Sequence, residues 1–298
     1  MATTRVSLLL LLAVALAGSV AGASAFTCTS GPCYNGTAAF YGDADGAGNE
    51  GNRNEQYTAI LCTHLCCLCW LICSHPFCCS FSFPAGVCGY GPAVAKPPFN
   101  AMVFAARDYS RTAVGCGRCF NITCRHPVCN PDGVTVTFAD YCSGGPCVDN
   151  DVIEMSGHAF SAIALPGRES ELRASPTVPV TYQLVDCRYS SSMAYLVDPT
   201  ATSERFTVVL LYVPGDAYPG LLTVHFKDES SEDWVDADPV GRYRLPKFTA
   251  TRKMVAPITI KVEGHYLIGP APENPTWSVT AADVIPVGWH GGKTYYAA

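Results

Sequence analysis

The chain has 298 residues, of which only 15% are charged, and its formal net charge is −6 at pH 7. A nucleic-acid-binding protein would carry a basic stripe, so this acidic balance argues against that class. The content of Gly, Pro, Val, Thr, Tyr and Phe favours strands and turns over helices, and the length allows two modest cores. We therefore expect an acidic, β-rich protein.

Residues 1–25 have the layout of a cleaved secretory signal peptide. One early charge, Arg5, precedes the apolar run Leu8–Ala17, and the small residues Ala23-Ser24-Ala25 follow it. An N-terminal membrane anchor is the alternative, but a spanning helix needs about twenty apolar residues and this run has about half of them. We expect processing after Ala25 and secretion into a space where cysteines form disulfides.

The mature chain begins with an aromatic segment over residues 37–46, which predicts a short strand that leaves into an Asp/Gly turn. The character then changes, because residues 56–95 contain no Asp, Glu, Lys or Arg and hold seven of the 17 cysteines between Cys62 and Cys79. A membrane helix is disfavoured by His64, His75 and Pro76 and by the lack of flanking basic residues. A zinc cluster is disfavoured because adjacent Cys–Cys pairs fit no closed tetrahedral spacing.

A third interpretation is that residues 52–86 are an insertion from a retained intron or an error in the gene model. Leu, Cys, Ser and Phe dominate this segment, and their codons are rich in pyrimidines, as the end of an intron is. Abundant peptides from this segment in the purified protein would rule the hypothesis out.

A run of cysteines follows the insertion: Cys116, Cys119, Cys124 and Cys129. The Cys116-x-x-Cys119 spacing suits zinc knuckles and redox motifs, but in a secreted protein it favours two halves of different disulfides. Half-cystines this close cannot all pair with each other without strain, so some must reach distant parts of the chain. No metal and no cofactor are predicted.

Further along the chain, the pattern predicts strands over residues 134–140 and 178–187 and a short helix over residues 157–165. Cys142 and Cys147 bracket a Ser-Gly-Gly-Pro turn and are expected to bridge locally. Residues 188–193 are polar and are predicted to form a linker, after which no cysteine occurs. Strand patterns at residues 206–213, 221–226, 258–262 and 277–281 predict a small antiparallel sandwich.

Several motifs in this order resemble the expansins, and the β-expansins and expansin-like proteins of plants most closely. They are Ala39–Gly46, Cys88-Gly89-Tyr90-Gly91, Gly115–Phe120, Met155–Phe160 and Asp283–Trp289. The resemblance implies an all-β fold: a six-stranded double-psi β-barrel over residues 26–187, then an immunoglobulin-like β-sandwich over residues 194–298 that binds polysaccharide. It also implies disulfides Cys88–Cys116, Cys119–Cys187 and Cys124–Cys129; to these, proximity in the sequence adds Cys28–Cys33 and Cys142–Cys147.

The resemblance places two acid/base-like carboxylates, Asp140 and Glu154, in the barrel groove. Expansin barrels look like those of cellulases that hydrolyse with two carboxylates, but expansins keep only the counterpart of the acid. The family usually has Asp where this chain has Glu154, and many members have Thr where this chain has Ala39. We expect Tyr41, Asp43, Asp140 and Glu154 to contact polysaccharide and no residue to be catalytic. The alternatives are that Asp140 caps a turn, Glu154 is solvated and Tyr41 packs in the barrel.

In the second domain, expansins bind glucan through exposed aromatic side chains. Trp234 matches one of these, but the expected Trp-Gly-x-x-Trp pattern is absent. Tyr243 or Phe248 could substitute, and the alternative for either is a place in the core. Trp289 is expected to be structural. Asn35 and Asn121 open Asn-x-Thr triplets and are potential glycan acceptors.

The expected function is that of a monomeric, extracellular plant cell-wall protein. It would loosen non-covalent contacts between cellulose and xylan-type matrix glycans without hydrolysis, and it would have no nucleic-acid partner and no membrane span when mature. The alternatives are a weak inverting endoglucanase that uses Asp140 and Glu154, a polysaccharide-binding or defence protein without loosening activity, and a non-functional product in which the insertion breaks the barrel.

Overall fold

The computed structural model describes residues 33–42, 87–107, 115–142, 147, 152–215, 222–241, 245–264 and 277–297. The expected signal peptide and insertion, together with Cys28, Asp43 and Tyr243, lie outside the described residues. Among the helices in these ranges, none is long and apolar enough to cross a membrane.

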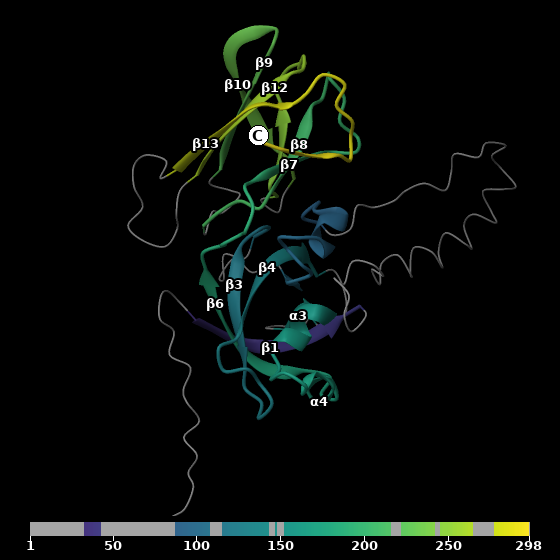
Figure 1. Ribbon diagram of the computed structural model, residues 1–298, viewed down its shortest axis with the longest axis vertical. Coiled ribbons are helices and arrows are strands. Elements are labelled where there is room, and N and C mark those ends of the chain that lie inside the picture. Colours follow the sequence, from purple (N-terminus) through teal and green to yellow (C-terminus); the bar gives the residue numbers. More distant parts are fainter. Residues whose placement is uncertain are drawn as a thin grey trace, which may run out of the picture.

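Two β-domains follow one another along the long axis of the molecule (Figure 1). The first is a closed barrel with strand order β1-β5-β2-β4-β3-β6, in which β1 and β5 are parallel, as are β2 and β4. This closed six-stranded barrel confirms the fold expected for the first part of the chain. Its strands are β1 (Cys33–Tyr41), β2 (Val103–Ala106), β3 (Cys119–Cys124), β4 (Val134–Tyr141), β5 (Val152–Ser156) and β6 (Val178–Val185).

The barrel interior is filled by aromatic side chains from alternating strand positions. The ring of Phe104 on β2 lies edge-on to Phe120 on β3 and to Phe138 on β4, at centroid distances of 5.5 and 5.4 Å. All three side chains are buried. Each such pair stabilises by about 0.5–1.5 kcal/mol beyond the area it buries, so this trio is central to the barrel core.

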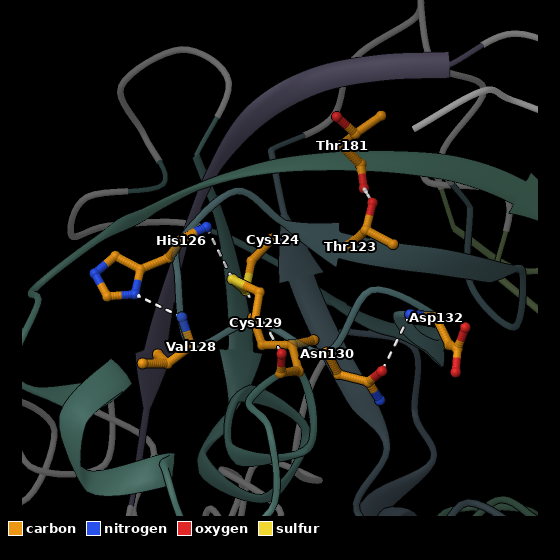
Figure 2. The surroundings of a disulfide bond; sticks show 9 residues. Thr123, Cys124, His126, Val128, Cys129, Asn130, Asp132 and Thr181 are labelled. Carbon is orange, nitrogen blue, oxygen red and sulfur yellow. Dashed lines mark hydrogen bonds between the residues drawn. A yellow bond between two sulfur atoms is a disulfide. The ribbon is translucent and has the colours of Figure 1, made fainter. Parts of the chain in front are cut away.

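Disulfides fasten the strand ends of the barrel, with Cα–Cα distances of 5.2 to 6.0 Å. Figure 2 shows the bridge that closes the turn after β3, where the backbone N–H of His126 donates to Cys129 Sγ (3.0 Å) and that of Val128 donates to His126 Nδ1 (3.4 Å). Cys33 is also disulfide-bonded. The bridged pairs, which the sequence analysis expected, are Cys88–Cys116, Cys119–Cys187, Cys124–Cys129 and Cys142–Cys147.

Within the described ranges, three short helical segments accompany the barrel: η2 (Gly91–Ala95), α3 (Gly157–Ala162) and α4 (Glu169–Arg173). Helix α3 starts where expected because the Ser156 hydroxyl accepts a hydrogen bond from the backbone N–H of Ala159 (3.0 Å), which caps its N-terminus. The other two segments were not predicted.

The second domain is an eight-stranded sheet folded into two layers, with order β13-β12-β9-β10-β11-β8-β7-β14. The long strand β10 joins the layers, because its first part pairs with β9 and its last three residues pair with β11. Phe206, Phe226 and Ile260 lie in the core between the layers. The strands are β7 (Ala194–Val197), β8 (Thr207–Leu211), β9 (Thr223–Asp228), β10 (Ser231–Pro239), β11 (Lys247–Ala250), β12 (Ile258–Gly264), β13 (Trp277–Ile285) and β14 (Thr294–Tyr296).

An aromatic cluster packs the two domains against each other. Phe99 of the barrel domain lies 5.2 Å from Tyr90, 5.6 Å from Tyr189 and 4.8 Å from Tyr212, measured between ring centroids. Tyr212 directly follows β8, and Tyr189 belongs to the expected linker 188–193. The segment between the domains therefore packs a partly buried ring against the core near its start, where its polar composition predicted no core residue before its end.

Asp228 and Arg252 form an ion pair that we expect to govern the acid stability of the second domain. The Asp228 carboxylate is buried and accepts hydrogen bonds from Arg252 Nη1 and Nη2 (both 3.0 Å) and from the backbone N–H of Val255 (2.7 Å). Burial alone would raise the pKa of Asp228, but the hydrogen bonds outweigh it and lower the pKa to about 2.

Since the folded pKa of Asp228 is below its unfolded value, about 2 kcal/mol of stability is present above about pH 4 and is lost as the pH falls to about 2. The variant Asp228→Asn should lose this contribution at neutral pH. Its free energy of unfolding, measured by chemical denaturation, should fall less steeply than that of the wild type as the pH is lowered from about 4 to about 2. Asp238→Asn, at an exposed position on β10, is the matched control. Equal acid limbs for the wild type and Asp228→Asn would contradict the prediction.

Candidate functional site

A row of side chains crosses four neighbouring strands of the barrel, and we call it the carboxylate row. Ala39 on β1 pairs with Glu154 on β5, Glu154 pairs with Ala105 on β2, and Ala105 pairs with Asp140 on β4. Directly paired residues project to the same face of a sheet. Ala39 and Ala105 are not members of the barrel core cluster, whereas their neighbours Ala38 and Ala106 are. The row therefore faces away from the interior, and two carboxylates flank the small side chain of Ala105.

A β-bulge turns Asp140 into this row. On β2 the residues Phe104 and Ala105 are consecutive, but their partners on β4 are Phe138 and Asp140, so Ala139 is the extra residue. Ala139 is 2% exposed and packs in the core together with Phe138. Bulges commonly re-aim a side chain beside a functional site. Here the bulge lets the buried run of β4 end on an acidic side chain at the surface.

One oxygen of Asp140 is fixed by the backbone. Oδ1 accepts the N–H of Val87 (2.6 Å) and the N–H of Tyr141 (2.8 Å). Burial raises the pKa of Asp140, and these two hydrogen bonds lower it by less, so the carboxyl stays neutral to a higher pH than an ordinary Asp. Among the described residues, Oδ2 has no hydrogen-bond partner. Asp140 is therefore a carboxyl with one oxygen fixed by the backbone and the other without a partner in the described ranges.

Tyr41 completes the face at the end of β1. It lies two residues beyond Ala39 and so projects to the same side of the strand. Its hydroxyl oxygen is buried and has no hydrogen-bond partner in the described part of the chain. Burial, and then the charges of Asp140 and Glu154, raise the pKa of the Tyr41 hydroxyl. The phenol is therefore a neutral donor close to both carboxylates.

Glu154 is 8% exposed and lies beside a disulfide. A carboxylate oxygen of Glu154 and the sulfurs of Cys142 and Cys147 all lie within 4.8 Å of one another. The two sulfurs are bonded to each other, so this group offers no thiolates to a metal ion. The alternative that Glu154 is simply solvated does not fit its burial.

The two potential glycan acceptors lie on barrel strands. Asn35 on β1 is exposed, and its Oδ1 accepts a hydrogen bond from the Thr181 hydroxyl (3.2 Å). Asn121 on β3 is half-buried, and its Nδ2 donates to the backbone carbonyl of Asp132 (3.4 Å). A glycan would attach at Nδ2, so Asn35 is the better placed of the two. Glycosylation at either site stays a prediction.

The second candidate surface surrounds Trp234 on the solvent-exposed face of strands β9, β10 and β12. Between Ser231 and Val235, β10 advances four residues while β9 advances two, so Trp234 lies in a bulge. The Trp234 side chain is 41% exposed. The Lys261 ammonium lies 5.4 Å from the Trp234 ring centroid, and the His225 ring stands edge-on at 6.5 Å. We call Trp234, His225, Lys261, Asp236 and Glu263 the Trp234 face.

The other aromatic candidates are placed differently. Phe248 on β11 is 1% exposed and belongs to the core of the second domain, so its ring offers no face to a sugar. The expectation that it could bind polysaccharide is corrected to a packing role. Trp289 packs edge-on against Phe206 at 5.5 Å, in accord with a structural role. Local sequence pattern does not mark His225 and Lys261, which the pairing of β9 with β12 brings next to Trp234.

Comparison with known proteins finds one family throughout most of the chain. The chain is 31% identical over 214 residues to putative expansin-B2 of Arabidopsis thaliana, covering 70% of this chain and 74% of that protein. It is 32% identical over 219 residues to expansin-B4 of Arabidopsis thaliana, with coverage of 70% and 78%. Pollen allergen Lol p 1 of Lolium perenne is 28% identical over 71% of this chain and 76% of its own length.

Two further comparisons concern the fold. Residues 101–182 match the family described as "Lytic transglycolase". A crystal structure of a mutant Clavibacter michiganensis expansin in complex with cellohexaose superposes with a TM-score of 0.52 at 16% identity, over 90% of this chain and 96% of that one. The likeness to the bacterial protein supports the arrangement of a barrel followed by a sandwich.

Proposed function

This chain belongs to the expansin superfamily, and from that membership we propose that it is a secreted plant cell-wall protein that loosens polysaccharide contacts without hydrolysis. Its partners would be cellulose and xylan-type matrix glycans, and it would act as a monomer without a cofactor. The bacterial expansin of the same fold was crystallised with cellohexaose, which supports a β-glucan chain as the ligand.

The carboxylate row is the observation that carries the proposal. A neutral Asp140 can donate through Oδ2 to a sugar oxygen while its Oδ1 stays held by two backbone N–H groups. The Tyr41 hydroxyl adds a second buried donor on the same face. Hydrogen bonds from such prearranged groups would replace those between neighbouring glycan chains, and no covalent bond would change.

The pH dependence of wall extension tests the role of the Asp140 carboxyl. Since burial raises its pKa, a larger fraction of Asp140 is a neutral donor at mildly acidic pH than in an ordinary Asp. We expect the extension of isolated walls under constant load to increase as the pH falls from neutral. A flat profile from acid to neutral pH would remove the donor role of Asp140.

A weak inverting endoglucanase is the second candidate function. The observation that favours it is the presence of two carboxylates on one row, one of them with a raised pKa, as a general acid requires. Release of reducing ends from glucan or xylan, lost in both Asp140→Asn and Glu154→Gln, would establish hydrolysis. Binding without any extension of walls would instead indicate a polysaccharide-binding protein with no loosening role.

A further inference from the structure

His225 lies between two carboxylates on the Trp234 face. Its Nδ1 is 2.8 Å from Asp236 Oδ1 on β10, and its Nε2 is 3.2 Å from Glu263 Oε2 on β12. The His225 side chain itself is only 16% exposed. The ring of a β9 residue thus links the two strands that flank β9 in the sheet.

Both contacts are hydrogen bonds only when the ring is protonated. A carboxylate has no hydrogen to give, and a neutral imidazole has one N–H and one lone pair. In the neutral ring, one nitrogen would therefore point a lone pair at a carboxylate, and that contact would be repulsive. The imidazolium has two N–H groups and satisfies both carboxylates. Histidine is also the side chain that ordinarily changes charge between about pH 5 and pH 8.

The other charged groups around His225 allow its protonated ring to keep both carboxylate contacts. From β12, Lys261 Nζ lies 3.3 Å from Glu263 Oε1, so Glu263 is shared between Lys261 and His225. Asp236 is 84% exposed, and among the described residues His225 is its ion-pair partner. On the same two strands, Lys227 of β9 pairs with Glu232 of β10.

The same network holds Trp234. Asp236 is two residues beyond Trp234 on β10, so its bond to His225 fixes the strand directly after the bulge. Lys261 extends over the Trp234 ring, and Glu263 holds Lys261. Loss of the Nδ1 contact with Asp236 therefore loosens the strand that carries Trp234. Loss of the Nε2 contact removes one restraint on the Glu263 carboxylate that pairs with Lys261.

We infer that His225 is a positioning residue for Trp234, and that its protonation strengthens polysaccharide binding by the Trp234 face. The inference rests on the proposed function in one respect, namely that Trp234 contacts the glycan. Since Asp236 is exposed, the effect is that of a partly solvated pair, and we expect affinity to fall about two- to fivefold between about pH 5 and pH 8.

The experiment uses the full chain and measures depletion binding to insoluble cellulose at about pH 5 and pH 8. The variant His225→Gln cannot be charged and should bind weakly at both pH values. The variant His225→Arg is always charged and can donate to both carboxylates, so it should bind tightly at both. His290→Gln, at an exposed position of the same domain, should keep the wild-type pH dependence.

A ligand-free readout separates this inference from the proposed function. The fluorescence of Trp234 is the part of the emission that disappears in Trp234→Phe. Its quenching by acrylamide should increase from pH 5 to pH 8 in the wild type and should not change in His225→Arg. If no variant binds cellulose but the quenching behaves in this way, the proposed function fails and the positioning role stands. Quenching and binding that do not depend on pH in the wild type, or that depend on it equally in His225→Arg, would overturn the inference.

Discussion

The variant Asp140→Asn should lower the extension of isolated cell walls about tenfold. The amide oxygen can still accept the N–H groups of Val87 and Tyr141, so the change preserves the shape of the site. The group at the position of Oδ2 becomes an amide NH2, which is a weaker donor than the O–H of a carboxylic acid. A tenfold loss corresponds to about 1.4 kcal/mol, within the range that one strong hydrogen bond contributes.

Two controls make this result specific. Asp132→Asn changes an exposed aspartate of the same barrel and should leave extension unchanged. Thermal unfolding should show that Asp140→Asn is folded under the assay conditions. Full extension by a folded Asp140→Asn would show that the carboxyl of this residue is not needed.

The variant Trp234→Ala should lower affinity for cellulose at least about tenfold. Trp234 is the exposed tryptophan of the second domain among the described residues, and removing a central aromatic contact typically costs about 2 kcal/mol or more. Depletion isotherms on insoluble cellulose measure the loss. We expect little effect on stability, because the side chain is exposed.

Tyr296→Ala is the matched control for this variant. Tyr296 is an aromatic residue of the same domain with 58% exposure, and it lies on β14, at the opposite end of the sheet order from β12 and β13. Its removal should not change binding. Equal losses in both variants would point to general surface hydrophobicity rather than to the Trp234 face.

The local sequence pattern was sufficient to predict the strands in which apolar and polar residues clearly alternate. Residues 134–140 and 178–187 were predicted as strands and correspond to β4 and β6, and the four patterns of the second half overlap β8, β9, β12 and β13. Strands β7, β10, β11 and β14 were not predicted. β10 is mostly exposed and acidic, so no hydrophobic alternation marks it. Its place in the sheet comes from pairing with distant strands.

The candidate sites were predictable only in part, for the same physical reason. The motif resemblance identified Asp140, Glu154 and Tyr41, but the bulge at Ala139 that aims Asp140 depends on the register between β2 and β4. His225 gave no signal, because its partners Asp236 and Glu263 lie 11 and 38 residues away in the sequence. For Phe248 the sequence left a binding role and a core role open, because an aromatic residue in a short pattern can face either side of a sheet.

Wall extension and release of reducing ends, measured on the same wall sample, test the central claim most directly. Heat-inactivated, native walls are held under constant load with the purified protein at mildly acidic pH, and the bathing solution is assayed for new reducing ends over the same interval. We predict extension that depends on Asp140 and Trp234, with no release of reducing ends above the protein-free control. Reducing ends that accumulate in proportion to extension, and that disappear in Asp140→Asn, would contradict a non-hydrolytic mechanism.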